Sequence, residues 1–579
     1  MSQDTDVRAA DPVLGRLAEA ILIPPFPGLS APGWMLDALG RGLAGVTLFG
    51  QNISAPDQVS GLTATLRSAA PGDDPVIAID EEGGDVTRVA YADGSPYPGN
   101  AALGAVDDVA LTQAVYRAIG ADLAALGINF DLAPCADVLG TADSPAVGTR
   151  SFGADTGLVS RHTAAAVAGL QGACVAACTK HFPGHGRTGT DTHEAIATIE
   201  GSLAELRLVD LPPFEAAIRA GTLAIMPSHL RVPELTGDLP ATVSAAAITG
   251  LLRGELGFTG VIVSDALEMR ATRDMFGIPG AAVLAVAAGT DLLCLGRDGS
   301  EDDYLAVRDA LVAAVRDGAL DGERLEEAAD RVARLRGGLA RTRSAAPAGD
   351  NAGPAVHLAA GPAVDLAAGP AVDLAVDPAA GPAVGSEVSR MVGPAVGLVA
   401  ARRAVRISGP HQTLSRPVII EVEPRENIAA GRFGWGLAPW APAGSVYRVS
   451  AAGRLLNGAG LGLADAARSG PADRGLADGG PADGGRVEGG PADGGRVDAA
   501  GILEAAAGRS LVAVVRDAHR DEQTRSLVNA LLAARPDLIL VEMGLPFWRP
   551  PEGTSYLATY GASRASAHAA AELLGLTPA

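Results

Sequence analysis

The sequence predicts an α/β protein in which a (β/α)8 TIM barrel is followed by a smaller α/β sandwich domain. Three observations lead to this fold class. Eight short apolar runs alternate with Ala- and Leu-rich segments that are long enough to form crossover helices. Most of the runs are continuously apolar, as expected of parallel strands that are buried on both faces. The alternation extends over roughly 330 residues, within the usual size range of this barrel.

The barrel is expected at residues 12–342, with one strand in each apolar run. In chain order the runs are AILIP (20–24), GVTLF (45–49), VIAID (76–80), INFDLAP (128–134), CVAACTK (174–180), LAIMPS (223–228), GVIVSD (260–265) and DLLCLG (291–296). Segments such as DDVALTQAVYRAIGADLAALG are typical of the helices that connect parallel strands. Hydrophobic residues make up 48% of the chain and aromatic residues 4%, so we expect a core of mainly Ala, Val and Leu.

The composition changes after residue 342. Residues 343–400 repeat an Ala-Gly-Pro-Ala-Val unit without any aromatic residue, which predicts a flexible low-complexity linker. A second repeat tract, residues 470–498, is richer still in Gly and Asp and is expected to be disordered. Around it, PVIIEVEP, SVYRVS, SLVAVVRDA and DLILVEMGLP have the pattern of strands, and DEQTRSLVNALLAARP that of a helix. Residues 401–579 are therefore predicted to form the sandwich domain, interrupted by 470–498.

Charge and composition argue against some classes of partner. The formal net charge of -22 disfavours nucleic acid and an anionic membrane as general partners. The polar, acidic N-terminal stretch lacks the regions of a secretory signal, and no apolar run reaches membrane-spanning length. The four cysteines lie in apolar segments, where reduced thiols are expected. We expect a cytoplasmic protein, and the sequence does not indicate its oligomeric state.

Polar residues collect at the C-terminal ends of the predicted strands. Asp80 ends one run and Asp265 ends another. Lys180 and His181 end a third, and the Ser-His pair at 228–229 closes a fourth. Solvation of strand ends alone does not explain why the opposite ends are poor in polar residues. We therefore expect the active site at this rim, where it forms in barrels of this kind.

The single lysine of the chain, Lys180, lies in CTKHFPGHGRTGTDTH (178–193), whereas the other 44 of the 45 basic residues are arginine. Three of the nine histidines share this stretch, and three interpretations compete. The first is a zinc site with the spacing C-x3-C-x2-H-x3-H, formed by Cys174, Cys178, His181 and His185. Because both cysteines lie in a strand-like run, no loop brings the four ligands together. We expect no metal and no cofactor.

The second interpretation gives each histidine a local structural role, and we retain it for His185, which lies between two glycines. The third is acid–base catalysis, in which the carboxylate of Asp191 orients the imidazole of His193 and stabilises its protonated form. Asp265 is the expected reacting partner, because a carboxylate at the end of a buried run is costly unless a site uses it. Glycoside cleavage requires such a carboxylate together with a proton donor.

These residues occur in motifs that resemble a known family. KHFPGHG, followed after four residues by DTH, resembles the signature of glycoside hydrolase family 3 in its bacterial β-N-acetylglucosaminidase branch. Five further motifs agree in the same order: IDEEGGDVTR (79–88), NFDLAPCADV (129–138), VGTRSFGAD (147–155), MPSH (226–229) and LLRGELGFTGVIVSDALEM (251–269). The resemblance covers residues 12–342, and the second domain resembles, less specifically, the α/β sandwich of two-domain members.

The resemblance implies a retaining hydrolase that removes terminal non-reducing β-linked N-acetylglucosamine from cell-wall-derived or chitin-derived saccharides. Asp265 stands at the nucleophile position and would form a covalent glycosyl-enzyme. His193, oriented by Asp191, would be the general acid and then the general base. The positions that match sugar-binding residues are Asp80, Arg88, Arg150, Lys180 and His181. Lys180 would present three donors from a compact cation, which the flat fork of arginine does not reproduce.

Three positions depart from the family pattern and leave the aglycone open between a muropeptide, a chitooligosaccharide and another β-glycoside. Asp85 stands where arginine is common, Arg187 where a small or acidic residue is frequent, and Ala266 where a second aspartate is usual. A phosphorylase on the same scaffold is the first alternative to a hydrolase. A β-glucosidase is a second, which the intact DTH motif argues against. A non-catalytic sugar-binding protein is a third, although it predicts the loss of a catalytic residue.

Overall fold

A computed structural model describes residues 12–72, 74–140, 144–189, 196–345, 393–410, 413–424, 436–453, 455–457, 503–504 and 506–576. These residues divide into two compact units. The first holds the residues up to Val405 and also Thr559–Ala569, and the second holds the rest. The predicted linker and the 470–498 tract lie almost wholly outside the described residues, so the expected domain boundaries stay predictions.

The first unit contains a closed barrel of eight parallel strands. They are β1 (Leu22–Ile23), β2 (Gly45–Leu48), β3 (Val76–Ile79), β4 (Phe130–Asp131), β5 (Ala176–Phe182), β6 (Ala224–Pro227), β7 (Val261–Ile262) and β8 (Leu293–Cys294). Strands β2 to β7 pair in sequence order, and β1 pairs with β8. A parallel bridge between Val263 and Leu292 joins β7 to β8, and the amide of Thr47 donates to the carbonyl of Pro24 to join β2 to β1. The predicted (β/α)8 barrel is confirmed.

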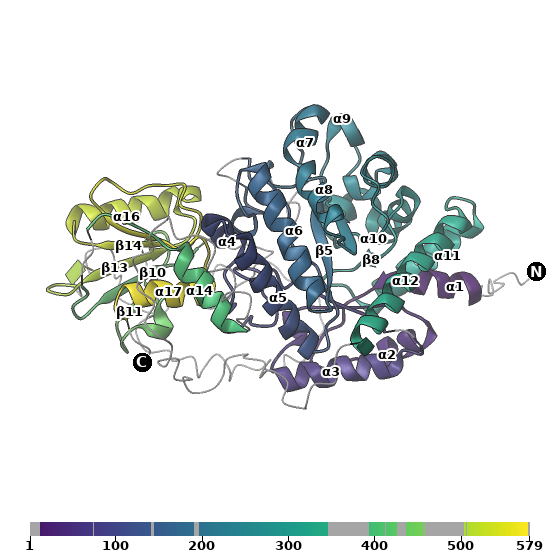
Figure 1. Ribbon diagram of the computed structural model, residues 1–579, viewed down its shortest axis with the longest axis horizontal. Coiled ribbons are helices and arrows are strands. Elements are labelled where there is room, and N and C mark those ends of the chain that lie inside the picture. The colour runs from purple at the N-terminus through teal and green to yellow at the C-terminus, as the bar shows by residue number, and fades with distance from the viewer. Residues whose placement is uncertain are drawn as a thin grey trace, which may run out of the picture. The chain divides into compact units, whose positions relative to one another are not determined.

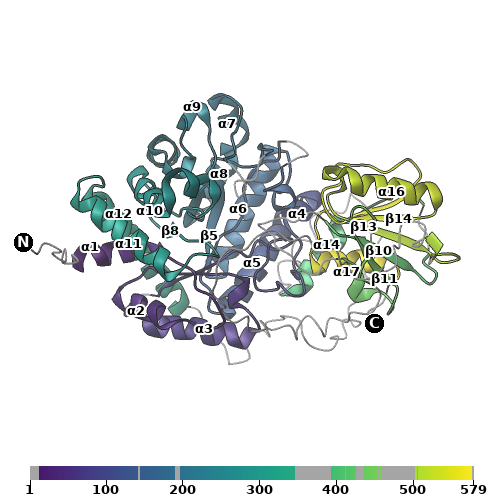
Figure 2. The ribbon, with the colours of Figure 1, turned by 180° about the vertical axis from the view of Figure 1, so that it is seen from behind.

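Helices surround these strands, as Figures 1 and 2 show for β5 and β8. The helices of the first unit are α1 (Pro12–Glu19), α2 (Gly33–Arg41), α3 (Pro56–Ala69), α4 (Asn100–Val106), α5 (Val109–Ala125), α6 (Thr156–Gly172), α7 (Leu203–Val209), α8 (Leu211–Arg219), α9 (Pro233–Thr236), α10 (Arg270–Ala288), α11 (Glu301–Arg316), α12 (Gly322–Ala345) and α14 (Pro394–Ala404). A π-helix covers Ala246–Glu255. Side-chain caps begin several of them: Asp108 accepts from the amide of Leu111 at the start of α5, and Asp155 from that of Leu158 at the start of α6.

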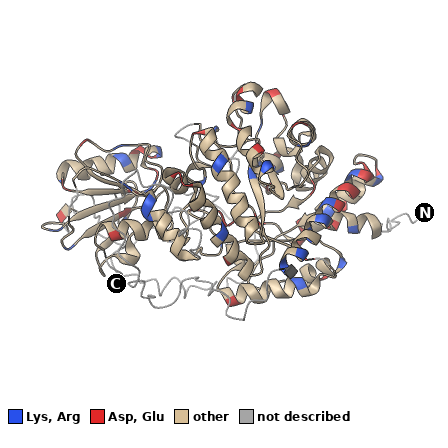
Figure 3. Cartoon of the chain, viewed as in Figure 1, with Lys and Arg blue, Asp and Glu red and all other residues tan. Residues whose placement is uncertain are grey.

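The barrel interior and the inner helix faces bury mainly Ala, Val, Leu and Ile, as the composition predicts. Charged residues lie on the outer helices, which Figure 3 shows along α11 and α12, while the strands carry few of them. At the start of β8 the buried carboxylate of Asp291 pairs with Arg253, Arg324 and Arg331. All four cysteines are free.

The second unit is built on one sheet of seven strands in the order β12-β11-β10-β13-β14-β15-β9. The strands are β9 (Arg406–Ser408), β10 (Val418–Val422), β11 (Val446–Val449), β12 (Leu455–Asn457), β13 (Leu511–Val515), β14 (Ile539–Glu542) and β15 (Ser555–Ala558). The five central strands are parallel, and β12 and β9 are antiparallel edges. Helix α16 (Glu522–Ala534) follows β13, and α17 (Arg564–Leu573) follows β15 and belongs to the first unit up to Ala569. This confirms the second, layered α/β domain.

The buried carboxylates of the second unit have structural roles. Glu421 accepts hydrogen bonds from the amides of Leu437 and Ala438. Glu542 accepts from three backbone amides after β13 and β14, and burial raises its pKa to about 8. These contacts satisfy both carboxylates within the fold, so neither indicates a reaction site.

Across the part of the chain that the structure describes, no single helix is long and apolar enough to cross a membrane. One sharply bent pair of helical segments, Pro233–Val243 and Ala246–Glu255, would be long and apolar enough together, by length and composition only.

Candidate active site

The C-terminal ends of β3 and β5 bring Lys180 between two carboxylates. Its Nζ lies 2.6 Å from Oδ1 of Asp80 and 2.9 Å from Oε1 of Glu82. Asp80 directly follows β3, Glu82 lies two residues further on, and Lys180 belongs to β5. Lys180 is 2% exposed, so its ammonium group is held by these carboxylates rather than by solvent. The predicted clustering of Asp80 and Lys180 at the rim is therefore present.

Two arginines complete what we call the rim cluster: Asp80, Glu82, Arg88, Arg150 and Lys180. Nη2 of Arg88 lies 3.7 Å from Oδ2 of Asp80. Arg150 makes a two-pronged contact with Glu82, with Nη2 2.6 Å from Oε1 and Nε 2.9 Å from Oε2. Such a bidentate pair fixes the guanidinium plane as well as its position.

The charges of the rim cluster keep Asp80, Glu82 and Lys180 ionised. Burial alone would raise the pKa of Asp80, but the charges of Lys180 and Arg88 outweigh it and hold that pKa below its ordinary value. Burial likewise opposes ionisation of Glu82, yet Arg150 and Lys180 hold its pKa well below the usual range. Burial would lower the pKa of Lys180, and the two carboxylates raise it instead. The site is thus a fixed array of donors and acceptors before any ligand binds.

Two further carboxyl groups beside the rim cluster, those of Asp131 and Glu81, have raised pKa values. Asp131, in β4, is fully buried, and its Oδ1 accepts from the amide of Glu81 at 3.0 Å. Burial raises the pKa of Asp131 well above its ordinary value. Burial also raises the pKa of Glu81 to about 7, although hydrogen bonds from Thr87, Val89 and Arg88 act in the opposite direction.

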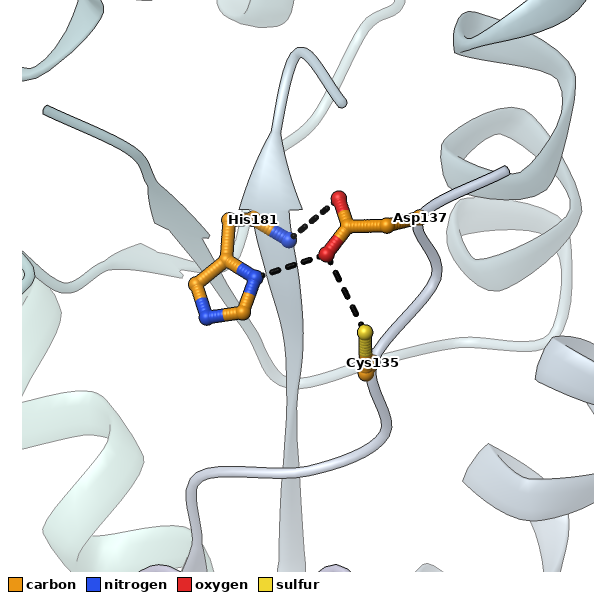
Figure 4. Close-up of side chains that lie close together, drawn as sticks. All are labelled: Cys135, Asp137 and His181. Atoms are coloured by element: carbon orange, nitrogen blue, oxygen red, sulfur yellow. Dashed lines mark hydrogen bonds and ion pairs between the residues drawn. The ribbon is translucent and has the colours of Figure 1, made fainter. Parts of the chain in front are cut away.

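His181 is fixed by a neighbouring carboxylate that the sequence did not single out. Figure 4 shows its imidazole beside Asp137, with the Cys135 sulfur at the same carboxylate oxygen as the ring. Nδ1 of His181 lies 2.7 Å from Oδ2 of Asp137, and Sγ of Cys135 lies 3.0 Å from the same oxygen. On the opposite side of the ring, Nε2 lies 3.3 Å from Nη2 of Arg150. His181 therefore adjoins the rim cluster, as expected.

The zinc set considered from the sequence is not brought together. Among the described residues, the one group of three metal-ligating side chains with mutually close ligand atoms is Cys135, Asp137 and His181. Cys178 is buried within β5, and Cys174 precedes that strand. His185 donates its backbone amide to Oδ1 of Asp137 at 2.7 Å, in agreement with a structural role for this residue.

Asp265 lies after β7, on the rim of the same barrel and partly buried. Its Oδ1 accepts from the amide of Ala266 at 2.8 Å. His229 contacts the loop that carries Asp265: its Nε2 lies 2.9 Å from the carbonyl oxygen of Ala266. On the other side of the ring, its Nδ1 lies 2.9 Å from Oγ1 of Thr242. His229, which sequence reasoning placed at the rim, thus connects the end of β6 to the Asp265 segment.

The predicted acid–base pair, Asp191 and His193, lies outside the described residues, which stop at 189 and resume at 196. On the preceding side, Arg187 forms a partly buried ion pair with Asp210, with Nε 2.9 Å and Nη2 2.7 Å from Oδ2. Arg187, one of the three departures from the family pattern, therefore forms a structural ion pair within the barrel unit.

Asp85, another departure from the family pattern, also has structural partners. Its Oδ2 accepts from the hydroxyl of Thr149, the neighbour of Arg150, and its Oδ1 accepts from the amide of Ala562 at 2.8 Å. The amide of Ala565 donates to the carbonyl of Ser95. Within the first unit, Asp85 thus joins the segment 559–569 to the loop after β3, which also carries Asp80 and Glu82.

Sequence reasoning missed three residues that shape the site: Glu82, Asn100 and Asp137. Glu82 lay within a quoted motif, and its place two residues after a strand-ending aspartate was a usable signal. Asn100 donates to the carbonyl of Arg150 at 2.7 Å and accepts from the hydroxyl of Tyr116 at 2.6 Å, so it fixes the Arg150 backbone.

Comparison with known proteins gives consistent results. The family model "Glycosyl hydrolase family 3 N terminal domain" matches residues 38–335. The chain is 39% identical over 256 residues to a β-hexosaminidase of Stenotrophomonas maltophilia, covering 43% of this chain and 75% of that protein. A β-hexosaminidase of Xanthomonas oryzae is 37% identical over 257 residues, with 43% and 75% covered. The solved glycoside hydrolase family 3 β-N-acetylglucosaminidase of Paenibacillus sp. FPU-7 is 29% identical, with a TM-score of 0.73 over 97% of this chain and 96% of that one.

Proposed function

The chain belongs to glycosyl hydrolase family 3 and is a glycosidase, and on this premise we propose that it removes terminal non-reducing β-linked N-acetylglucosamine by a retaining mechanism. The observation that carries the proposal is the lone lysine held between Asp80 and Glu82 at the rim. The names of its relatives, β-hexosaminidases and a β-N-acetylglucosaminidase, support the choice of sugar.

The rim cluster has the chemistry of a site for a hydroxyl-rich ligand. Lys180, Arg88 and Arg150 offer only donors, and the carboxylates of Asp80 and Glu82 offer only acceptors. A sugar hydroxyl both donates and accepts, so neighbouring groups of both kinds can bind it at once. Because the pairs already hold one another in place, little order has to be created when the sugar binds.

In the proposed first step, a carboxylate oxygen of Asp265 attacks the anomeric carbon as the bond to the leaving oxygen breaks. His193, oriented by Asp191, gives its proton to that oxygen. In the second step His193 takes a proton from water, and the water oxygen displaces Asp265 from the sugar. The carboxylate and the protonated imidazole are thereby regenerated, and the sugar keeps its β-configuration.

The test is the initial rate on 4-nitrophenyl N-acetyl-β-glucosaminide, measured in paired buffers with and without phosphate. Equal rates that yield free N-acetylglucosamine would support a hydrolase. Phosphate-stimulated release of the sugar 1-phosphate would instead make the protein a phosphorylase. Binding of N-acetylglucosamine without turnover of any aryl glycoside would instead support a non-catalytic sugar-binding protein.

A further inference from the structure

The carboxylate of Asp137 is saturated by four donors. Oδ1 accepts from the amides of His181 and His185 at 3.2 Å and 2.7 Å. Oδ2 accepts from the Nδ1 of His181 at 2.7 Å and from the thiol of Cys135 at 3.0 Å. Burial alone would raise the pKa of Asp137, but His181 and the other donors outweigh it and hold the pKa below its ordinary value. Asp137 is thus a buried, ionised acceptor.

The two sides of the His181 ring specify the same tautomer. An ionised carboxylate can only accept, so the nitrogen that faces Asp137, Nδ1, carries hydrogen. A guanidinium can only donate, so the nitrogen that faces Arg150 at 3.3 Å, Nε2, presents its lone pair. The opposite tautomer would set a lone pair against a carboxylate and a proton against a cation.

The same geometry argues against a metal ion held by Cys135, Asp137 and His181. A metal on Nδ1 would displace its hydrogen and leave a neutral imidazole protonated on Nε2, directed at the guanidinium of Arg150. It would also require the Cys135 thiolate, and burial raises the pKa of this thiol well above its ordinary value. The group fits a closed set of hydrogen bonds better than a ligand set.

We propose that Asp137 is a positioning residue that holds His181 in the Nδ1–H tautomer, so that Nε2 accepts a hydrogen bond from a hydroxyl group of the sugar. This role rests on the proposed function. A sugar hydroxyl that accepts from Arg150 in place of Nε2 must direct its own hydrogen to an acceptor, and the Nε2 lone pair that Arg150 then releases is an uncharged acceptor 3.3 Å from that guanidinium. Asp137 then acts on binding without touching the ligand.

The chain offers a matched control in a second buried histidine. His162 has Nε2 3.1 Å from Oδ1 of Asp107, and its Nδ1 lies 2.8 Å from the hydroxyl of Thr112. This pair also lies in the first unit, where Thr112 belongs to α5 and His162 to α6, and neither His162 nor Asp107 belongs to the rim cluster. Asp107→Asn, like Asp137→Asn, removes a carboxylate from a buried histidine, so it shows whether the loss of such a pair elsewhere alters the His181 tautomer or turnover.

The experiment is ¹⁵N NMR of the full chain labelled at histidine, with the His181 signal assigned from its loss in His181→Gln. We expect hydrogen on Nδ1 of His181 in the wild type and a shift toward Nε2 in Asp137→Asn. On 4-nitrophenyl N-acetyl-β-glucosaminide, Asp137→Asn should lower kcat/KM about 10- to 100-fold, the size of effect found when a carboxylate that orients a metal-ligating histidine is removed. Asp107→Asn should match the wild type in both readouts.

Hydrogen on Nε2 of His181 in the wild type would overturn the proposal, as would an unchanged KM in a folded Asp137→Asn variant whose tautomer has shifted. If Asp137→Asn does not fold, Cys135→Ser and Cys135→Ala test the same role of Asp137. Serine keeps a hydrogen-bond donor to Oδ2 of Asp137, and alanine removes it. Serine should preserve the tautomer and kcat/KM within about twofold, and a shift with serine would contradict the role. Since the NMR readout needs no substrate, it distinguishes this proposal from an error in the proposed function.

Discussion

Replacing Lys180 by methionine tests whether the rim cluster depends on its one ammonium group. Lys180 is 2% exposed and its Nζ contacts Asp80 at 2.6 Å and Glu82 at 2.9 Å. Methionine fills a similar volume without charge. Glu82 keeps Arg150 at 2.6 Å, whereas Asp80 keeps the more distant Arg88 at 3.7 Å. The variant therefore leaves one buried carboxylate poorly compensated.

Removing one partner of a buried ion pair costs about 3–5 kcal/mol. The side chain of Asp80 is 19% exposed and retains Arg88, so we expect the lower end, about 3 kcal/mol at pH 7. The contribution of Lys180 is present below its unfolded pKa, since its folded pKa is raised, and it is lost at strongly alkaline pH. The contribution of Asp80 is present above its unfolded pKa, since its folded pKa is lowered, and it is lost in acid. The destabilisation should shrink at both extremes.

Urea unfolding followed by circular dichroism at several pH values measures this difference. Arg331→Met is the matched control, because the buried Asp291 that it leaves retains Arg253 and Arg324. We expect about 1 kcal/mol or less for the control at pH 7. A Lys180→Met loss no larger than that of the control, or a loss that does not diminish in acid, would refute the electrostatic reasoning.

Four further outcomes can be checked. Asp265→Ala should abolish turnover with the fold intact by circular dichroism, while His193→Ala should slow glycosides with poor leaving groups far more than activated aryl glycosides; equal losses on both classes would contradict the acid role. The pKa of Glu81 is raised to about 7 in the folded protein, so the free energy of unfolding of the wild type falls as pH rises from about 4.5 to 7. Glu81→Gln lacks this carboxyl group, so urea titrations should show that it gains stability relative to the wild type over that range. Asp85→Ala removes both acceptors of its carboxylate and should cost about 1–3 kcal/mol, seen as faster proteolysis within 559–569; unchanged cleavage would mean that Asp85 does not hold this segment.

The barrel was predictable because its strands are buried on both faces and therefore read as continuous apolar runs. Seven of the eight predicted runs contain an observed strand, and the eighth, 174–180, overlaps β5, which extends to Phe182. The edge strand β9 (Arg406–Ser408) was missed, since its residues are exposed and its run, RIS, has no apolar pattern. Its pairing with β15 is antiparallel and depends on a chain segment about 150 residues away. A local pattern carries no information on such a contact.

The site was predictable where a residue ends a strand, because the barrel topology alone brings strand ends together. Asp80 and Lys180 were found in this way. Asp137 was not, because it lies in a loop after β4 and its partner lies on β5, so nothing local distinguishes it from a solvated aspartate. The signal that the sequence does contain, an acidic residue two positions after a buried cysteine, acquires meaning only once both elements are placed.

The return of residues 559–569 to the first unit has a consequence for biosynthesis. The amide of Ala562 satisfies Asp85, and that of Ala565 satisfies the carbonyl of Ser95, in the segment that follows Asp80 and Glu82. A ribosome that has made only the barrel residues has not yet supplied these donors. The barrel unit therefore reaches its final set of contacts only after residues 559–569 have left the exit tunnel, and a chain truncated before residue 559 lacks part of that unit's own structure.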